Sequence, residues 1–343
     1  MSLPTRQLGK DGPQVTALGL GLMGLSMAYG PPKPDAERMA FLDKAYELGE
    51  RNWDTADMYG DNEDLLGRWF AAHPTRRPTI FLATKFGNRL DAATGARSID
   101  SSPAYCKAAL ERSLGRLGLP SVDLYYCHRL DAATPIELTV RAMAELQAAG
   151  KIRHIGLSEC SAASLRRACA VAKVAAVQVE YSPFALDAEA ERVGLLRACR
   201  ELGVAVVAYS PLGRGMLSGA IKSPEDFAGE GDFRSVLPRF QGGNFVKNLE
   251  LVRRIEGIAR GKGVTSAQLT LAWLLRQGVD VVPIPGTTRV EGLVENLGAL
   301  EVELTDEEDR VVREASEGAE VAGERYPEVF MKACFADTPP LEG

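Results

Sequence analysis

Histidine is scarce in this chain of 343 residues, which contains only His73, His128 and His154. Because imidazole is the commonest protein ligand of metal ions, this scarcity argues against a metal centre, and we expect none. The cysteines include no CxxC pair, and scattered cysteines in a large chain are typical of reduced thiols that serve packing. There are six of them: Cys106, Cys127, Cys160, Cys169, Cys199 and Cys334.

Long apolar runs and basic clusters are also missing. No run of about 18 apolar residues occurs, so no transmembrane helix is expected, and the opening "MSLPTRQLGKDG" lacks the apolar core of a signal peptide. The net charge is −6, with acidic and basic residues interspersed, whereas a nucleic-acid surface needs a basic patch. We therefore expect a cytoplasmic protein whose partner is a small molecule, not a membrane or a nucleic acid. The sequence indicates no particular oligomeric state.

What the sequence does contain is a regular alternation of two kinds of segment. Short runs rich in Val, Ile, Leu and Tyr predict strands at 15–21, 52–56, 79–85, 122–128, 152–158, 175–181, 204–210 and 281–286. Amphipathic stretches predict helices at 35–49, 101–118, 134–150, 161–172, 188–203, 265–278 and 288–300. Strict alternation implies parallel strands with right-handed crossovers, and eight such units fit a closed (β/α)8 barrel.

No change in composition marks a linker, so residues 1–343 are expected to form a single α/β TIM-barrel domain. Three additions to the barrel are predicted: an N-terminal β-hairpin turned at Asp11-Gly12, an extra C-terminal helix near 305–316, and a peripheral tail at about 317–343. One long irregular stretch remains, at 211–247, and such loops in compact domains are usually functional or disordered.

The active site of such a barrel lies at the C-terminal ends of the strands. There the sequence presents an acid, a phenol, an amine and an imidazole: Asp54, Tyr59, Lys85 and His128. The lysine is expected to lower the pKa of the phenol, and the aspartate to hold the lysine. These groups suit proton delivery to a developing alkoxide. Each alone has an ordinary structural interpretation, and their joint placement favours catalysis.

A literal GxGxxG fingerprint, "GLGLMG" at 19–24, offers a different interpretation, a Rossmann-type dehydrogenase. A phosphate-binding turn of that kind needs a helix that begins within the glycines. Here "GPPKP" follows at 30–34, and the first good helix begins only near Asp35. We therefore expect these glycines to allow close approach of a strand or ligand, with Met23 and Tyr29 lining the substrate mouth.

Several motifs resemble those of the aldo-keto reductase superfamily. The segments "DTADMYG", the strand-end Lys85 and "YYCHRLD" are similar to its active-site signatures. "GKIRHIGLSECS", "VQVEYSPF", "AYSPLGRGMLSG" and "PIPGTTRVEGLVENLGALEVELT" resemble its later motifs, and "GDFRSVLPRFQGGNFVKNL" resembles the bacterial and plant branch of YakC-type reductases. The resemblance covers nearly the whole chain. It implies a single barrel that uses NADPH without a metal, with Tyr59 as the acid for carbonyl reduction and the base for alcohol oxidation.

The resemblance also implies which residues hold the cofactor. They are Ser158, Glu159 and Gln178 at the carboxamide, Tyr209 on the nicotinamide ring, Ser210, Leu212, Gly213 and Arg214 at the pyrophosphate, Gly286, Thr287, Thr288 and Arg289 at the 2′-phosphate, and Glu295 and Asn296 at the adenine. Two positions depart from the pattern. Many relatives carry Asn in place of Glu159, which leaves open that Glu159 points elsewhere, and Gly292 stands where other branches carry Arg or Gln.

The function implied is NADPH-dependent reduction of small aldehydes or ketones. The alternative is a regulatory or redox-sensing barrel subunit that binds NADPH and turns over slowly. Substrate choice is expected to depend on three loops, 23–34, 86–100 and 211–247.

Overall fold

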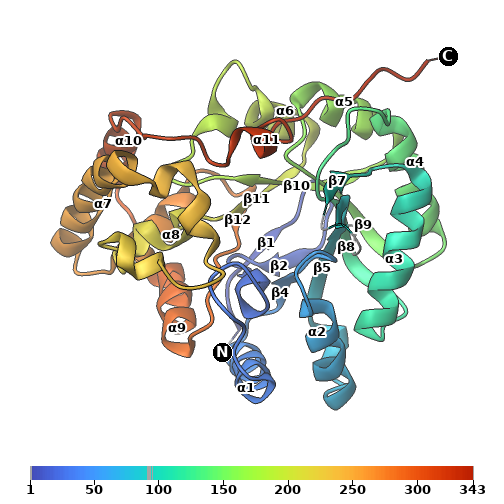
Figure 1. The fold of residues 1–343 in the computed structure, drawn as a ribbon, viewed down its shortest axis with the longest axis horizontal. Helices are drawn as coiled ribbons and strands as arrows, with labels where there is room; N and C mark the ends of the chain where they lie inside the picture. The colour runs from blue at the N-terminus through green and yellow to red at the C-terminus, as the bar shows by residue number, and fades with distance from the viewer. Residues whose placement is uncertain (1, 91–93, 95, 343) are drawn as a thin grey trace.

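The computed structural model describes residues 2–90, 94 and 96–342. Parallel strands form an eight-stranded sheet in the order β12-β11-β10-β9-β8-β5-β4-β3 (Figure 1). Their bounds are β3 (Leu20–Gly21), β4 (Asn52–Asp54), β5 (Phe81–Phe86), β8 (Val122–Cys127), β9 (Ile152–Ser158), β10 (Val174–Glu180), β11 (Ala205–Tyr209) and β12 (Val281–Pro283). Each lies within or next to one of the eight segments predicted as strands.

The first and last strands meet and close the barrel. The backbone N–H of Gly19 donates to the carbonyl of Pro283 at 2.8 Å, that of Gly21 donates to Pro285 at 3.1 Å, and Gly21 pairs with Gly286 in a parallel bridge. A Cβ atom on Gly21 would lie 2.9 Å from the Ile284 carbonyl oxygen. The glycines of "GLGLMG" therefore serve close strand approach, as predicted, and a short 3-10 turn at Met23–Leu25 follows them instead of a helix.

Helices surround the barrel (Figure 1). They are α1 (Asp35–Glu47), α2 (Asn62–Ala72), α3 (Pro103–Leu117), α4 (Ile136–Ala148), α5 (Ala162–Val171), α6 (Leu195–Leu202), α7 (Gly242–Lys262), α8 (Ser266–Arg276), α9 (Val290–Gly298), α10 (Asp306–Glu317) and α11 (Glu328–Met331). Helix α3 illustrates the local signals: the Ser102 hydroxyl accepts from the Tyr105 N–H, Pro103 opens the helix, and Gly118 ends it at φ 62°. The predicted (β/α)8 barrel with extra C-terminal helices is confirmed.

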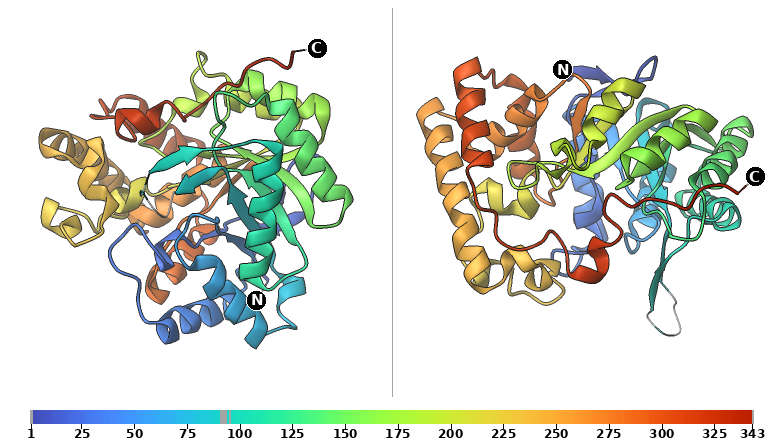
Figure 2. Two further views of the ribbon diagram at one scale, coloured as in Figure 1. Left: turned by 45° about the vertical axis from the view of Figure 1, so that its right-hand side comes forward. Right: turned by 90° about the horizontal axis from the view of Figure 1, so that it is seen from above.

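The predicted N-terminal hairpin is also present, as β1 (Thr5–Gln7) and β2 (Gln14–Thr16). Leu8 and Val15 enter a buried cluster with barrel side chains such as Leu124 and Val207. The hairpin therefore covers one end of the barrel (Figure 2, right).

Several local features differ from the predictions. The helix predicted at 188–203 begins only at Leu195, because Gly194 takes φ 62° and breaks the earlier part. The irregular stretch, predicted at 211–247, ends at Gln241 and contains four short 3-10 turns. Helices α2 and α7 were not predicted, and neither was a second hairpin, β6 (Asn88–Leu90) with β7 (Arg97–Ile99). This hairpin belongs to the predicted substrate loop at 86–100, of which residues 91–93 and 95 lie outside the described residues.

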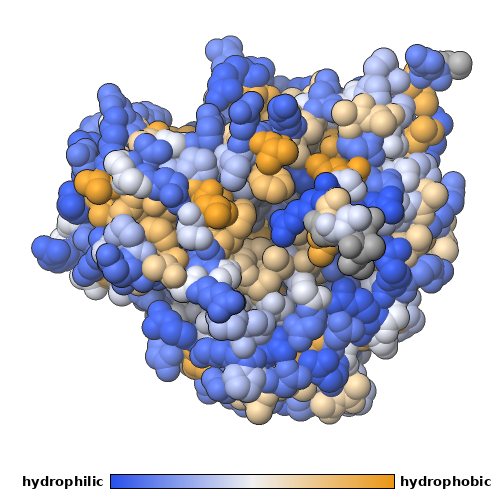
Figure 3. All heavy atoms as spheres, viewed as in Figure 1, coloured by the Kyte–Doolittle hydropathy of each residue, from blue (hydrophilic) through white to orange (hydrophobic). Residues whose placement is uncertain are grey.

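The opposite end of the barrel carries the C-terminal ends of the strands. The turns between β11 and α7, the β6–β7 hairpin and the C-terminal tail all lie on that side (Figure 2, right). Apolar side chains gather near the middle of this face, inside a largely hydrophilic rim (Figure 3). In the part of the chain that the structure describes, no helix is long and apolar enough to cross a membrane.

Candidate active site

Asp54, Lys85 and Tyr59 form a connected buried group at the ends of β4 and β5. The Lys85 ammonium, which is fully buried, donates to the Asp54 carboxylate, to the Thr55 carbonyl at 2.7 Å and to the Tyr59 hydroxyl at 3.4 Å. The second Asp54 oxygen accepts from the Gln178 amide at 2.8 Å. A buried charge pair of this kind is stable only when its hydrogen bonds are satisfied, as they are here.

The pKa of the Tyr59 hydroxyl is raised, whereas the sequence led us to expect it lowered. Burial raises the pKa of Tyr59 by disfavouring phenolate, and Lys85 opposes this without overcoming it. The pKa of Lys85 is also raised: burial lowers it, but Asp54 and Tyr59 together outweigh burial. At neutral pH the group therefore holds a neutral phenol beside an ammonium ion, which is the protonation state of a general acid.

His128 lies beside the Tyr59 ring, directly after β8. Its ring centroid is 5.9 Å from that of Tyr59, at an interplanar angle of 81°. Burial lowers the pKa of His128 well below its usual value, and Lys85 and Arg129 lower it further. Its buried Nδ1 has no hydrogen-bond partner among the described residues. His128 is therefore a neutral imidazole with hydrogen-bonding capacity to spare.

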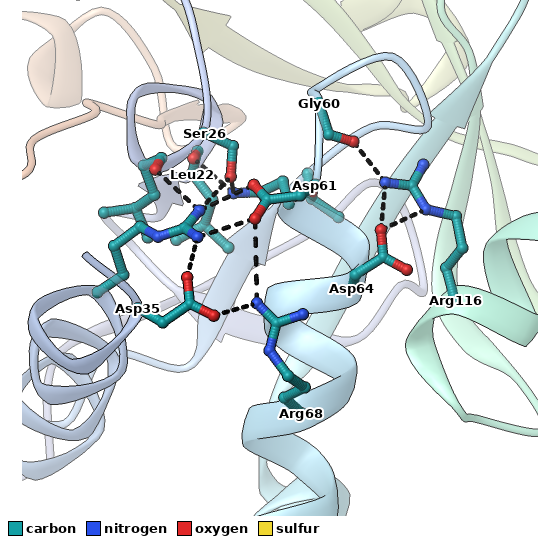
Figure 4. Close-up of polar contacts among 12 residues, drawn as sticks. Leu22, Ser26, Asp35, Gly60, Asp61, Asp64, Arg68 and Arg116 are labelled. Carbon is teal, nitrogen blue, oxygen red and sulfur yellow. Dashed lines mark hydrogen bonds and ion pairs between the residues drawn. The ribbon is translucent and has the colours of Figure 1, made fainter. Parts of the chain in front are cut away.

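The loop that carries Tyr59 is held by an arginine on each side (Figure 4). Arg116 of α3 donates to the carbonyls of Asp57 and Gly60, which flank Tyr59, and pairs with Asp64 at 2.8 Å. The buried Glu63 carboxylate also pairs with Arg116, at 3.3 Å, so two carbonyls and two carboxylates fix one planar guanidinium. The loop backbone on both sides of the phenol is thereby tied to a helix.

Arg38 of α1 holds the other end of this loop. Its guanidinium makes two hydrogen bonds of 2.8 Å to the Asp61 carboxylate, and one of 3.3 Å to the Leu25 carbonyl. The Arg38 hydrogen bonds lower the pKa of Asp61 to about 2. Asn62 adds a bond of 3.0 Å to the Leu22 carbonyl. The Tyr59 loop and the exit loop of β3 are therefore joined (Figure 4).

Replacing Arg116 by Met should lower kcat for the carbonyl reduction that the family resemblance implies by roughly tenfold, because misplacement of a reacting group is costly. Unfolding by urea, followed by circular dichroism, should show that the variant remains folded. Arg112→Met is the matched control, since Arg112 lies on the same helix and stacks on Tyr105 instead of the loop carbonyls. Equal kcat values for the two variants would contradict a positioning role for Arg116.

The predicted carboxamide-binding residues lie at the ends of β9 and β10. Ser158 and Gln178 are buried and adjacent in register, and the Ser158 hydroxyl accepts from Arg129 at 3.3 Å. Glu159 is fully buried, and protein groups occupy both of its carboxylate oxygens. Arg325 donates to both of them, at 2.9 and 3.0 Å, and the Tyr209 hydroxyl donates to one at 2.8 Å.

The predicted nicotinamide and pyrophosphate residues follow β11. Ser210, Gly213 and Arg214 all have positive φ, at 48°, 56° and 58°, so the chain turns sharply over the barrel mouth. The Arg214 guanidinium pairs with Glu180 at 3.1 Å and lies 4.7 Å from the centre of the Tyr326 ring. Leu212 packs against the main core.

The predicted adenosine-phosphate residues gather at the start of α9. Gly286 and Arg289 are exposed, the Thr287 hydroxyl accepts from the Arg289 N–H at 3.2 Å, and the exposed Arg289 side chain forms no ion pair with the described residues. Thr288 and Glu295 are half-buried and Asn296 is buried. A helix N-terminus beside a free guanidinium and hydroxyls fits a phosphate group.

Met23 and Tyr29 lie in the exit loop of β3, and Tyr29 is 37% exposed. This loop contacts the stretch after β11: Tyr29 bridges to Asp232, and the Arg234 guanidinium lies 5.1 Å from the Tyr29 ring centre. Phe240 is buried against Phe227 and Phe245. It therefore packs the interior of this segment.

The remaining histidines and the cysteines take part in packing and ion-pair contacts outside the tyrosine–lysine–aspartate group. His73 pairs with Asp43 at 3.1 Å, and His154 packs against Phe81. All six cysteines are unpaired thiols, and burial raises the pKa of each, including Cys127 and Cys160 beside the site. A raised pKa keeps these thiols protonated near neutral pH, whereas the thiolate is the nucleophile.

The carboxyl ends of three strands of a closed (β/α)8 barrel, β4, β5 and β8, thus place a tyrosine–lysine–aspartate group next to a neutral histidine. Residues 17–317 match the model of the aldo/keto reductase family, and the chain belongs to that family. The predictions of aldo-keto reductase membership and of an enzyme of this class are confirmed.

Four known proteins illustrate this membership. The chain is 52% identical to "Aldo-keto reductase yakc [NADP(+)]" of Schizosaccharomyces pombe and 45% identical to "Aldo-keto reductase str7" of Strobilurus tenacellus, each over 99% of both chains. Among solved structures, a glycerol dehydrogenase from Gluconobacter oxydans is 27% identical, with a TM-score of 0.81 over 94% of this chain and 98% of its own. A thermostable aldo-keto reductase solved with the inhibitor epalrestat is 31% identical, with a TM-score of 0.71 over 91% and 100%.

Proposed function

We propose that this protein reduces small aldehydes or ketones to alcohols with NADPH as the hydride donor, and catalyses the reverse oxidation. The observation that carries the proposal is the buried chain of hydrogen bonds from Asp54 through Lys85 to the Tyr59 hydroxyl, beside His128. The S. pombe relative, named as an NADP(+) enzyme, supports the choice of cofactor.

In this proposal Tyr59 is the general acid. A carbonyl oxygen seated between Tyr59 and His128 accepts hydrogen bonds from the phenol and the neutral imidazole. As negative charge develops on that oxygen, the Tyr59 proton moves to it, and Lys85 stabilises the phenolate that remains. Asp54 keeps Lys85 charged and in place. In the oxidation direction the same phenolate removes the proton from the alcohol.

NADPH, when bound, supplies the hydride that reduces the carbonyl carbon. We assign its carboxamide to Ser158 and Gln178, its nicotinamide ring to Tyr209, and its pyrophosphate to the turn at 210–214. The 2′-phosphate is assigned to the start of α9, where Gly286, Thr287, Thr288 and Arg289 lie, and the adenine to Glu295 and Asn296. The exposed Arg289 guanidinium, which forms no ion pair with the described residues, supports this fit at the 2′-phosphate.

Replacing Arg289 by Ala should weaken NADPH binding roughly tenfold to a hundredfold, because one charge-assisted hydrogen bond to phosphate is lost. NADH lacks the 2′-phosphate, so its dissociation constant should hardly change. Quenching of protein fluorescence measures both constants on the same variant. Equal losses for the two cofactors would contradict 2′-phosphate recognition by Arg289.

The activity itself is tested by following NADPH oxidation against four carbonyl classes: aliphatic aldehydes, α-dicarbonyls, aromatic ketones and pyridoxal. Turnover of at least one class that requires Tyr59 supports the reductase. Tight NADPH binding without turnover of any class would favour the regulatory alternative.

A further inference from the structure

The C-terminal tail, defined here as residues 325–339, crosses the face that carries the strand ends (Figure 1). Residues of this tail reach the loop after β9. The Ala336 N–H donates to the Glu159 carbonyl at 2.8 Å, and the Ser161 N–H donates to the Ala336 carbonyl at 2.8 Å. Farther along, Thr338 contacts Ser164. The tail is therefore bound to the barrel at its distal part through backbone pairing.

Its proximal part contains a buried ion pair between Arg325 and Glu159, with Glu180 as a second, more distant partner of Arg325 at 3.8 Å. The backbone just before Arg325 is held separately, by Asn248 at Ala322. Arg325 and Glu159 have side-chain exposures of 2% and 0%, and the guanidinium donates to both carboxylate oxygens. Such bidentate pairs are strong and directional. The Phe335 N–H adds a third donor from the tail, at 3.3 Å to Glu159 Oε2.

Glu159 also has two features that an ordinary loop residue lacks. Its φ is 50°, a left-handed conformation that a non-glycine residue keeps only when its surroundings hold it. Its carboxylate accepts hydrogen bonds from the Tyr209 hydroxyl at 2.8 Å and from the Glu180 N–H at 3.2 Å. One side chain thus joins the tail to the residue assigned to the nicotinamide ring.

The ion pair brings the next tail residue to the mouth of the barrel. The Tyr326 hydroxyl lies 3.1 Å from the Tyr209 hydroxyl, and the Arg214 guanidinium covers the Tyr326 ring at 4.7 Å. Both contacts are with side chains of the proposed cofactor and substrate region. Release of Arg325 would free Tyr326 and leave the Tyr209 ring less constrained.

We propose that Glu159 is a positioning residue: through Arg325 it anchors the C-terminal tail over the barrel mouth, and through the Tyr209 hydroxyl it orients the ring that faces the cofactor. Tyr326 then forms a fixed wall of the substrate mouth. This inference rests on the proposed function, because it takes the barrel mouth to be the site where cofactor and substrate bind. In this proposal the Glu159 side chain binds Arg325 and Tyr209 of the protein and does not contact the carboxamide of the cofactor.

The test uses the full chain with Arg325→Met, Glu159→Gln and the double variant, which removes both charges and so leaves neither buried alone. Arg325→Lys is the conservative variant. Arg313→Met is the matched control, because Arg313 of α10 forms a half-buried pair with Glu189 and not with a tail residue. Thermal melting monitored by circular dichroism identifies any variant that fails to fold.

Hydrogen exchange followed by mass spectrometry should show the amides of Phe335 and Ala336 exchanging roughly tenfold faster in Arg325→Met and in the double variant. Steady-state kinetics of Arg325→Met should show KM for the carbonyl substrate raised and kcat little changed, since Glu159, Tyr209 and the tyrosine–lysine–aspartate group are not substituted. Arg325→Lys should recover part of both effects, and Arg313→Met should show neither.

Unchanged exchange in a folded double variant would overturn the anchor, and faster exchange with unchanged KM would overturn its role at the mouth. The exchange experiment needs no substrate. A wild-type protein without carbonyl turnover would therefore count against the proposed function, while exchange alone would still decide whether Glu159 and Arg325 hold the tail.

Discussion

Tyr59→Phe is expected to lower kcat for carbonyl reduction by about 10²–10⁴-fold, the usual contribution of a general acid. The substitution removes only the hydroxyl, which lies 3.4 Å from the Lys85 ammonium, and leaves the ring in place. Stopped-flow measurement of NADPH oxidation under single-turnover conditions reports the chemical step directly. The dissociation constant of NADPH, from fluorescence quenching, should be nearly unchanged.

The pKa of Tyr59 is part of this expectation. Because burial raises it, the phenol stays protonated through neutral pH in the free enzyme. Ionisation of Tyr59 should therefore not lower the rate of reduction between about pH 6 and 8. Histidine is the side chain that normally titrates in this range. Wild-type turnover in Tyr59→Phe would contradict the role of Tyr59 as the general acid.

Lys85→Met is expected to have the second large effect, on both stability and activity. It would leave Asp54 as an uncompensated buried charge, and breaking a buried pair in this way costs about 3–5 kcal/mol of unfolding free energy. The phenolate formed during reduction would also lose its neighbouring cation. Denaturation by urea measures the first effect, and single-turnover NADPH oxidation the second.

Two variants separate these effects. Asp54→Asn combined with Lys85→Met removes both charges, so it should recover much of the stability and none of the activity. Lys151→Met removes an exposed lysine paired with Glu111, and exposed pairs contribute only about 0–1 kcal/mol. A Lys85→Met protein as stable as Lys151→Met, with normal turnover, would contradict the role given to the ion pair.

The barrel and its strand ends could be predicted from the sequence because they follow a short-range pattern. Apolar strand runs and amphipathic helices repeat at fixed periods, and strand ends share one rim in parallel α/β folds. Asp54, Lys85 and His128 all stand at such ends. The same reasoning rejected "GLGLMG" as a phosphate turn, because the prolines after it exclude a helix.

The supporting residues could not be found in this way, because they lie on helices and in the tail and act over long sequence separations. Arg116 reaches the Tyr59 loop from α3, and Arg325 reaches Glu159 across 166 positions. The sequence offered one signal of these contacts: Glu159 in "GLSECS" departs from the asparagine of many relatives. A buried acid needs a cation, and Arg325 supplies it. The direction of the Tyr59 pKa shift was missed for a related reason: burial, which a sequence does not quantify, outweighs the nearby lysine.

The most direct test of the account is deuterium transfer. NADPH that carries deuterium in both hydrogen positions of the nicotinamide C4 is incubated with a small aldehyde, and the alcohol is analysed by mass spectrometry. We predict that the wild-type protein yields an alcohol carrying the label on the former carbonyl carbon, and that Tyr59→Phe yields almost none in the same time. Unlabelled alcohol, no alcohol from the wild type, or equal yields from the two proteins would contradict the account.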